Sequence, residues 1–105
     1  MNPRKALRRS RGAYTAIKGG MPAVTRTPAL ELAQEGITVN AISPGLIGTE
    51  MNTALMDNPE VYRDLTSRIP LARWGTPEEV GKLAAYLSGP DAGFVTGTDV
   101  LIDGV

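Results

Sequence analysis

Residues 36–45 read Gly-Ile-Thr-Val-Asn-Ala-Ile-Ser-Pro-Gly, and this stretch decides the fold class. β-Branched residues recur from Ile37 to Ile42, which favours a short buried strand. Ser43-Pro44-Gly45 follows and predicts a turn at the carboxyl end of that strand. Before the stretch, Gly12 to Gln34 places apolar residues at helical spacing, with Gly36 as a helix stop. A helix that leads into a strand and a glycine loop is typical of an α/β sheet.

Two prolines interrupt the expected helix. Pro22 and Pro28 both fall inside it. An interior proline removes a backbone hydrogen bond and clashes with the preceding turn, at a cost of about 3 kcal/mol. We therefore expect the helix to kink or break at these positions.

The rest of the chain predicts further helices and a last strand. Met51 to Ser67 is weakly helical and is interrupted at Asn58-Pro59. Thr76-Pro77-Glu78-Glu79 predicts a helix start, because Thr76 can cap and Pro77 sits where its missing N–H costs nothing. Gly89-Pro90 ends that helix, and Val100 to Ile102 predicts the last strand. The expected buried stripe of the helix consists of Val80, Leu83, Ala84 and Leu87.

Composition narrows the chemistry that the chain can perform. The 105 residues are 42% hydrophobic and 21% charged, as in ordinary globular domains, and they include no cysteine and no histidine. Disulfides, thiolate metal sites and imidazole acid–base catalysis are therefore excluded. Catalysis would depend on tyrosine, lysine, serine or carboxylates. No apolar run approaches the roughly 18 residues of a membrane span, so we expect a cytoplasmic protein without a membrane partner.

The charge distribution is uneven although the net charge is zero. The first eleven residues hold five of the eleven bases and no acid. Residues 12–105 therefore carry six bases and eleven acids, a net charge of minus five. We interpret residues 1–11 as a solvated basic tail. A contact with nucleic acid is the weaker alternative, because the tail has no aromatic residue for stacking.

Tyr14 and Lys18 form a candidate acid–base pair. Their spacing of four residues puts the phenol and the ammonium on one face of a helix. A phenol has an ordinary pKa near 10, and a cation within about 4 to 6 Å lowers that pKa toward the neutral range. Such a pair also occurs by chance in many helices, so its context decides its meaning.

Ordered blocks across residues 12–104 supply that context, because together they resemble the carboxy-terminal half of the short-chain dehydrogenase/reductase family. The blocks are Tyr14-x-x-x-Lys18, Leu30-Glu31-Leu32-Ala33-x-x-Gly36-Ile37-x-Val39-Asn40-Ala41-Ile42-Ser43-Pro44-Gly45, Thr49, Ile69-Pro70-Leu71-x-Arg73-Trp74-Gly75-Thr76-Pro77-Glu78-Glu79-Val80, Ala84-Ala85-Tyr86-Leu87-Ser88 and Val95-Thr96-Gly97-x-x-x-Leu101-Ile102-Asp103-Gly104. Ordered agreement across separate blocks is more specific than any one motif.

The resemblance implies an α/β fold, namely the carboxy-terminal part of a Rossmann-like doubly wound parallel sheet in residues 12–105. It implies an oxidoreductase that uses NAD or NADP and acts on an alcohol or ketone, as a homo-oligomer in full-length relatives. By resemblance, Tyr14 exchanges a proton with the substrate oxygen, and Lys18 bonds the nicotinamide ribose and lowers the pKa of Tyr14. The expected cofactor contacts are Tyr14, Lys18, Pro44, Gly45, the backbone at Ile47, and Thr49.

The first strands and the glycine-rich phosphate loop of the family are absent from the sequence, so the choice between NAD and NADP cannot be read. The family's catalytic serine would fall near Met1 and Asn2, and Ser10 is better explained as a cap or an exposed hydroxyl. The alternative reading is therefore a truncated, catalytically inactive fragment or an interaction module. Under either reading we expect exposed sheet edges and little or no nicotinamide binding by the isolated chain. Glu50 to Arg68 resembles the family's substrate lid but is diagnostic of no single compound.

Several other residues have structural interpretations. Trp74 is expected to pack as a hydrophobic anchor. Asn40 is expected to form structural hydrogen bonds. Glu78 and Glu79 are adjacent on a helix, so they predict a cap and not an acid–base pair. Asp103-Gly104 matches a terminal family motif and is expected to be structural.

Overall fold

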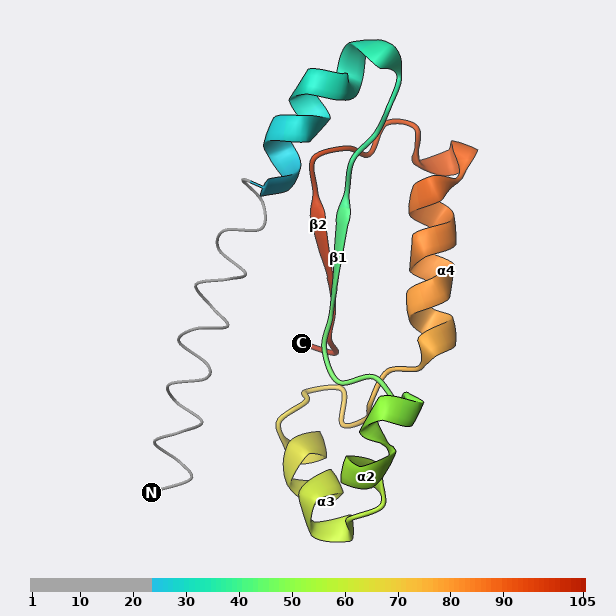
Figure 1. Ribbon diagram of the computed structural model, residues 1–105. Coiled ribbons are helices and arrows are strands. Elements are labelled where there is room, and N and C mark those ends of the chain that lie inside the picture. Colours follow the sequence, from blue (N-terminus) through green and yellow to red (C-terminus); the bar gives the residue numbers. More distant parts are fainter. Residues whose placement is uncertain (1–23) are drawn as a thin grey trace. The chain divides into compact units, whose positions relative to one another are not determined.

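The computed structural model describes residues 24–105, which fall into two compact units. The first combines residues 24–41 with Val95–Asp99, and the second combines Ile42–Phe94 with Val100–Val105 (Figure 1). Tyr14, Lys18 and Pro22 lie outside the described residues, as does the basic tail. The predictions that rest on them are therefore not tested by the fold.

In the described part of the first unit, residues 24–32 are helical and continue into the 3₁₀ turn η1 (Ala33–Glu35). Gly36 ends it with a left-handed φ of 74°, which confirms the predicted stop. The helix runs through Pro28 without interruption, so the predicted break there is wrong. Thr25 and Ala29 on this helix are each only 4% exposed. Burial of this face outweighs the cost of the proline.

The sheet of the described residues consists of β1 (Ala41–Pro44) and β2 (Asp99–Ile102). The amide of Ala41 donates to the carbonyl of Thr98 (2.9 Å), and the amide of Gly45 donates to the carbonyl of Ile102 (3.0 Å). Both pairs advance along the chain in the same direction, so the strands are parallel. β2 confirms the predicted last strand and extends it by one residue.

The first predicted strand, Ile37 to Ile42, is displaced, because β1 starts at Ala41 and includes Ser43 and Pro44. The predicted turn at those two residues is therefore also wrong. Residues 37–40 leave the regular ladder because side chains take over their pairing. The amide of Val39 donates to Thr96 Oγ1 (3.0 Å), and Asn40 Nδ2 donates to the carbonyl of Val95 (3.0 Å). Asn40 Oδ1 also accepts from the amide of Thr98 (3.2 Å), which confirms its structural role.

The second unit contains η2 (Glu50–Asn52), α2 (Thr53–Met56), α3 (Pro59–Ser67), α4 (Pro77–Ser88) and η3 (Pro90–Ala92). The predicted interruption at Asn58-Pro59 is confirmed, because Asn58 caps α3 by accepting from the amide of Val61 (3.3 Å). The predicted ends of α4 are confirmed as well. Thr76 and Glu79 form a reciprocal capping box at its start, and Gly89 follows its last residue.

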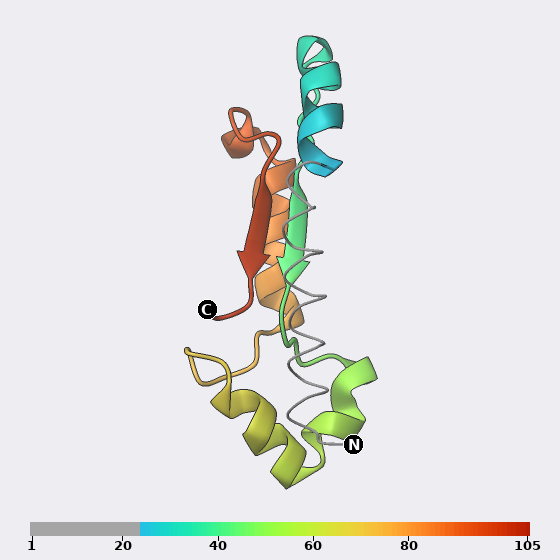
Figure 2. The same ribbon diagram turned by 90° about the vertical axis from the view of Figure 1, so that its left-hand side faces the viewer.

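Within the second unit, α4 lies along one face of the strand pair (Figures 1 and 2). No residue of α4 is fully buried, so the predicted buried stripe is only half-buried. The reason is the width of the sheet, because two strands offer too little surface to cover a helix face. None of the helices between residues 24 and 105 has the length and hydrophobicity to cross a membrane.

Trp74 anchors the small core of the second unit, as predicted. It is 5% exposed, and its ring stacks on that of Tyr62 with centroids 5.6 Å apart. Its indole Nε1 donates to Thr66 Oγ1 (3.0 Å). Gly104 lies against the buried Ile69 with a φ of 76°, and its carbonyl accepts from the amide of Leu71 (3.1 Å), so Asp103-Gly104 has the expected structural role.

Candidate functional site

The end of β1 and the loop that follows it carry four of the predicted cofactor contacts: Pro44, Gly45, Ile47 and Thr49. Pro44 is exposed at the end of β1. A Cβ on Gly45 would lie 2.7 Å from Asp103 Cβ and 2.9 Å from Asp103 Cα. The loop therefore passes so close to the end of β2 that only glycine fits at residue 45.

Ile47 lies in an isolated parallel bridge with Gly75. The amide of Gly48 donates to the carbonyl of Gly75 (2.9 Å), and the amide of Gly75 donates to the carbonyl of Leu46 (2.9 Å). In an extended segment, the amide and carbonyl of one residue point to the same side. The amide and carbonyl of Ile47 therefore point away from Gly75.

On that side the carbonyl of Ile47 accepts two hydrogen bonds, whereas the amide of Ile47 donates none to the described residues. The carbonyl accepts from Asn52 Nδ2 (2.6 Å) and from the amide of Thr49 (2.9 Å). The amide of Ile47 has no hydrogen-bond partner among residues 24–105. Ile47 itself is only 8% exposed, so this donor sits in a partly desolvated position that favours a ligand acceptor.

Thr49 follows on the same loop and is half-buried. Its carbonyl accepts from the amide of Asn52 (3.0 Å), while its hydroxyl bonds to no other described residue. The structure thus brings together Gly45, Ile47 and Thr49 in one loop. Tyr14 and Lys18 lie outside the described residues, so their position beside this loop remains a prediction.

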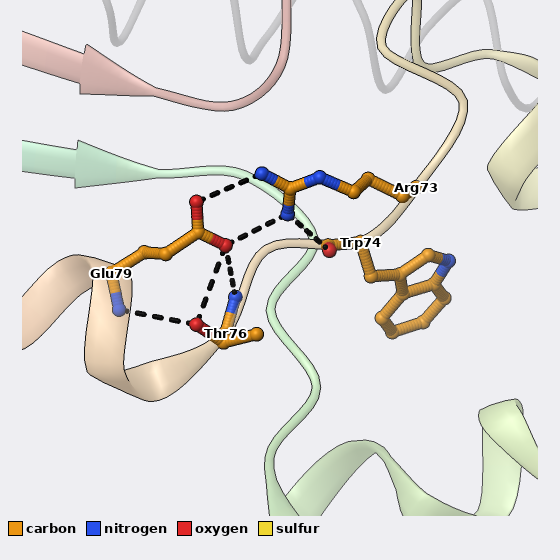
Figure 3. Close-up of polar contacts among 4 residues, drawn as sticks. All are labelled: Arg73, Trp74, Thr76 and Glu79. Carbon is orange, nitrogen blue, oxygen red and sulfur yellow. Dashed lines mark hydrogen bonds and ion pairs between the residues drawn. The ribbon is translucent and has the colours of Figure 1, made fainter.

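An ion pair fixes the segment that holds Gly75 against Ile47. Arg73 Nη1 and Nη2 donate to Glu79 Oε1 and Oε2 at 2.7 and 2.9 Å (Figure 3). Glu79 Oε1 also accepts from the amide of Thr76 (3.1 Å), and Arg73 Nη1 donates to the carbonyl of Trp74 (3.1 Å). The Trp74 ring points away from this cluster. The Glu79 carboxylate therefore caps α4 and bonds to the backbone amide of Thr76. Through Arg73 it is also linked to the carbonyl of Trp74, so the residues on both sides of Gly75 are held.

The Arg73 guanidinium has an electrostatic effect on its partner. Its hydrogen bond, together with that from the Thr76 amide, lowers the pKa of Glu79 from 4.5 to about 2. The pKa of Arg73 is raised in turn by the Glu79 carboxylate. Glu79 therefore stays charged at neutral pH. Its capping box with Thr76 confirms the predicted helix cap at this residue.

The chemistry available to the loop is hydrogen bonding. It offers one open amide, one hydroxyl and a glycine at a close approach, but no titratable side chain. In the part of the chain that the structure describes, no cluster of three potential metal ligands occurs. The loop can hold a polar ligand, whereas an acid or base must come from another segment.

Sequence reasoning missed Asn52 and the ion pair between Arg73 and Glu79. An asparagine just before a helix normally signals a cap, so nothing in the sequence points to its bond with Ile47. The ion pair spans the start of α4, and the capping-box spacing alone does not predict a partner six residues upstream of Glu79.

A family model described as enoyl-(acyl carrier protein) reductase matches residues 4–104, nearly the whole chain. The chain belongs to the short-chain dehydrogenase/reductase family. It is 40% identical over 91 residues to the glucose 1-dehydrogenase of Gluconobacter oxydans. That alignment covers 87% of this chain and 34% of the relative, so the chain spans about a third of the length of such short-chain dehydrogenases.

Solved structures of the family agree with this assignment. A 4-hydroxyisoleucine dehydrogenase complexed with NADH has a TM-score of 0.77 and 34% identity over 89% of this chain and 38% of its own. An Agrobacterium tumefaciens protein with bound NADP has a TM-score of 0.75 and 40% identity over 87% of this chain and 37% of its own. The α/β fold expected from the sequence is thus confirmed as part of a Rossmann-type short-chain dehydrogenase/reductase, whose members bind NADH or NADP.

Proposed function

We propose that this chain carries the nicotinamide-facing part of an NAD(P)-dependent oxidoreductase that interconverts an alcohol and a ketone. The observation that supports this most is the open amide of Ile47, which lies in the loop directly after β1. Ligands of open α/β sheets bind at the carboxyl ends of the strands, where this loop lies. Family membership makes a nicotinamide cofactor the ligand class to consider first.

The donors of the loop fit the polar groups of such a cofactor. The carboxamide of nicotinamide has a carbonyl that can accept from the Ile47 amide. The Thr49 hydroxyl can bond the carboxamide or the neighbouring phosphates. Gly45 keeps the backbone close to the strand end, and Pro44 presents an apolar ring surface there. When bound, the nicotinamide supplies the hydride donor or acceptor.

We assign the proton step to Tyr14 and its support to Lys18. In the reducing direction, the Tyr14 phenol would give its proton to the carbonyl oxygen of the ketone, whose carbon would take the hydride that a bound reduced nicotinamide supplies. Tyr14 would then regain a proton from solvent. A positive charge on Lys18 favours the phenolate form between these transfers and so lowers the pKa of Tyr14.

The substrate is proposed only by class. The Gluconobacter relative is named a glucose dehydrogenase and the NADH-bound neighbour a 4-hydroxyisoleucine dehydrogenase. These names concern unlike compounds that share a hydroxyl group to be oxidised. An alcohol or ketone is therefore the proposed substrate of this chain.

A fusion protein tests the proposal, because this chain aligns with only 34% of the length of the Gluconobacter relative. In the fusion, residues 12–105 replace the matching part of the Gluconobacter enzyme. We expect the fusion to bind NADH or NADPH, as measured by nicotinamide fluorescence. We also expect it to oxidise glucose or another alcohol. Tyr14→Phe should lower kcat by about 10² to 10⁴-fold, since general acid–base catalysis contributes that much.

Matched controls come from α4, which carries an exposed tyrosine and a lysine of its own. Tyr86→Phe and Lys82→Ala should leave kcat within about twofold, because both side chains are exposed on α4. A fusion that binds neither nucleotide, beside a parent enzyme that does, would overturn the proposal. Equal activity of the Tyr14→Phe and Tyr86→Phe variants would refute the role of Tyr14.

The second candidate function is a non-catalytic interaction module. Several large apolar side chains of the second unit are exposed, among them Tyr86 (49%), Phe94 (105%) and Leu101 (50%). Exposed apolar side chains that gather into one patch are typical of surfaces that contact a partner. Self-association of the whole chain in light scattering, together with an inactive fusion, would favour this candidate over the oxidoreductase.

A further inference from the structure

We propose that Asn52 is the positioning residue that aims the Ile47 amide at the nicotinamide. This inference rests on the proposed function and deepens it. It starts from the bond between Asn52 Nδ2 and the carbonyl of Ile47, which at 2.6 Å is among the shortest in the loop. Asn52 would not touch the cofactor itself but would act through the backbone of Ile47.

Two consecutive peptide groups determine where the Ile47 amide points. The first joins Leu46 to Ile47, and its carbonyl accepts from the amide of Gly75 (2.9 Å). The second joins Ile47 to Gly48, and its amide donates to the carbonyl of Gly75 (2.9 Å). The bridge thus holds both peptide groups from one side, and it leaves the carbonyl and the amide of Ile47 on the other side.

Asn52 holds the carbonyl on that second side. Its side chain donates to the carbonyl of Ile47, and its backbone amide donates to the carbonyl of Thr49 (3.0 Å). Of the groups within residues 24–105 that bond to these two peptide groups, Asn52 contributes the one side chain, and the others are backbone groups. Three of the four polar atoms are therefore occupied, and the Ile47 amide is left as the open donor.

The ordinary explanation for this asparagine does not hold. Asn52 occupies the N-cap position of α2, where an asparagine side chain usually accepts from the helix amides. Here it makes no side-chain cap bond, and its amide group is turned to Ile47 instead. The side chain thus serves the loop and not the helix.

The matched pair of variants is Asn52→Asp and Asn58→Asp. At residue 52 the carboxylate cannot donate to the Ile47 carbonyl, and its charge repels that oxygen. At residue 58 the same change keeps the acceptor that caps α3, because Asn58 Oδ1 receives the Val61 amide. Both variants add one negative charge within the same region of the chain, so their difference reports the lost donor.

The first readout is backbone amide exchange, measured by NMR on the whole chain without cofactor. The amides of Gly48 and Thr49 should exchange about tenfold faster in Asn52→Asp than in Asn58→Asp. The Gly48 amide belongs to the peptide group whose carbonyl loses the Asn52 bond, and the Thr49 amide donates to that same carbonyl. Exchange in α4 should be equal in the two variants. Equal exchange at Gly48 and Thr49 would overturn the proposal.

The second readout is cofactor binding in the fusion described above. Asn52→Asp should raise the KM and the Kd for NADH or NADPH about tenfold while kcat at saturating cofactor stays within about twofold. Asn58→Asp should match the unchanged fusion. A nucleotide Kd that is the same in both variants would refute the positioning role while the proposed function stands. If the unchanged fusion binds no nucleotide, the proposed function fails, and faster exchange would then assign Asn52 to loop structure alone.

Discussion

Arg73 and Glu79 are joined by two parallel hydrogen bonds, at 2.7 and 2.9 Å, across the start of α4. The same carboxylate accepts from the backbone amide of Thr76 (3.1 Å). The residue between these contacts, Gly75, forms the bridge to Ile47. The ion pair thus holds the segment around Gly75, to which the candidate loop is bridged. Because the pair lies at the surface, its main effect is to orient this segment, and its own contribution to the free energy of folding is small.

Removing the charge of Glu79 should weaken the fold in a pH-dependent way. Glu79→Gln keeps a side-chain oxygen for the capping box but loses the carboxylate. Because hydrogen bonds from Arg73 and the Thr76 amide lower the pKa of Glu79 from 4.5 to about 2, the native chain binds fewer protons than the unfolded chain between these values. The stabilisation is complete above the ordinary pKa and is lost as the pH falls through about 2.

The measurement is the Tm of the wild-type chain and of Glu79→Gln across the acidic range. We expect a constant difference near neutral pH that narrows in acid and closes at the lowest pH. Glu78→Gln is the control, because Glu78 is exposed and forms no ion pair with another described residue. A difference for Glu79→Gln that does not change with pH would contradict the assigned pKa.

Two glycines should respond in opposite directions to replacement by alanine. Gly45→Ala should lower the free energy of unfolding by about 1 to 3 kcal/mol, because the new Cβ meets both Cα and Cβ of Asp103 within 3 Å. Gly81→Ala should raise it by about 0.5 to 1 kcal/mol, since the position is open and lies inside α4. Urea unfolding measures both. A neutral Gly45→Ala would show that the loop does not pass so close to β2.

The stacked pair of Trp74 and Tyr62 predicts a graded loss of stability. Trp74→Phe keeps an aromatic ring on Tyr62 but loses the bond to Thr66, which should cost about 1 kcal/mol. Trp74→Ala should cost about 3 to 5 kcal/mol, as is usual when a buried aromatic side chain is removed. If both variants unfold at the same urea concentration, Trp74 is not the anchor of this unit.

Local signals in the sequence predicted helix ends well. The start of α4 depends on Thr76 and Glu79, which contact each other within one turn, so the pattern contains the whole interaction. The same holds for the cap at Asn58. The strand boundaries were less accurate because β1 is defined by partners far away along the chain, such as Thr98 for Ala41. Burial of Thr25 and Ala29 likewise overrides the local cost of Pro28.

The candidate site was only partly predictable. Its position after the first strand follows from the turn residues and the family resemblance, and Ile47 and Thr49 lie in one loop as expected. The residue that orients that loop, Asn52, was not predicted, because its bond to Ile47 replaces the helix cap that the sequence favours. Tyr14 and Lys18 remain predictions.

The chemical shift of the Ile47 amide is the measurement that tests most directly whether this loop contacts the nicotinamide. In the fusion labelled with ¹⁵N-isoleucine, addition of NADH or NADPH should move the Ile47 amide resonance downfield. The nucleotide concentration at the midpoint of this shift should equal the midpoint of the nicotinamide fluorescence titration. The Ile69 amide, which already donates to the carbonyl of Thr66 (3.0 Å), should stay in place as the reference. A stationary Ile47 resonance while fluorescence reports saturation would contradict the assignment of this loop to the nicotinamide.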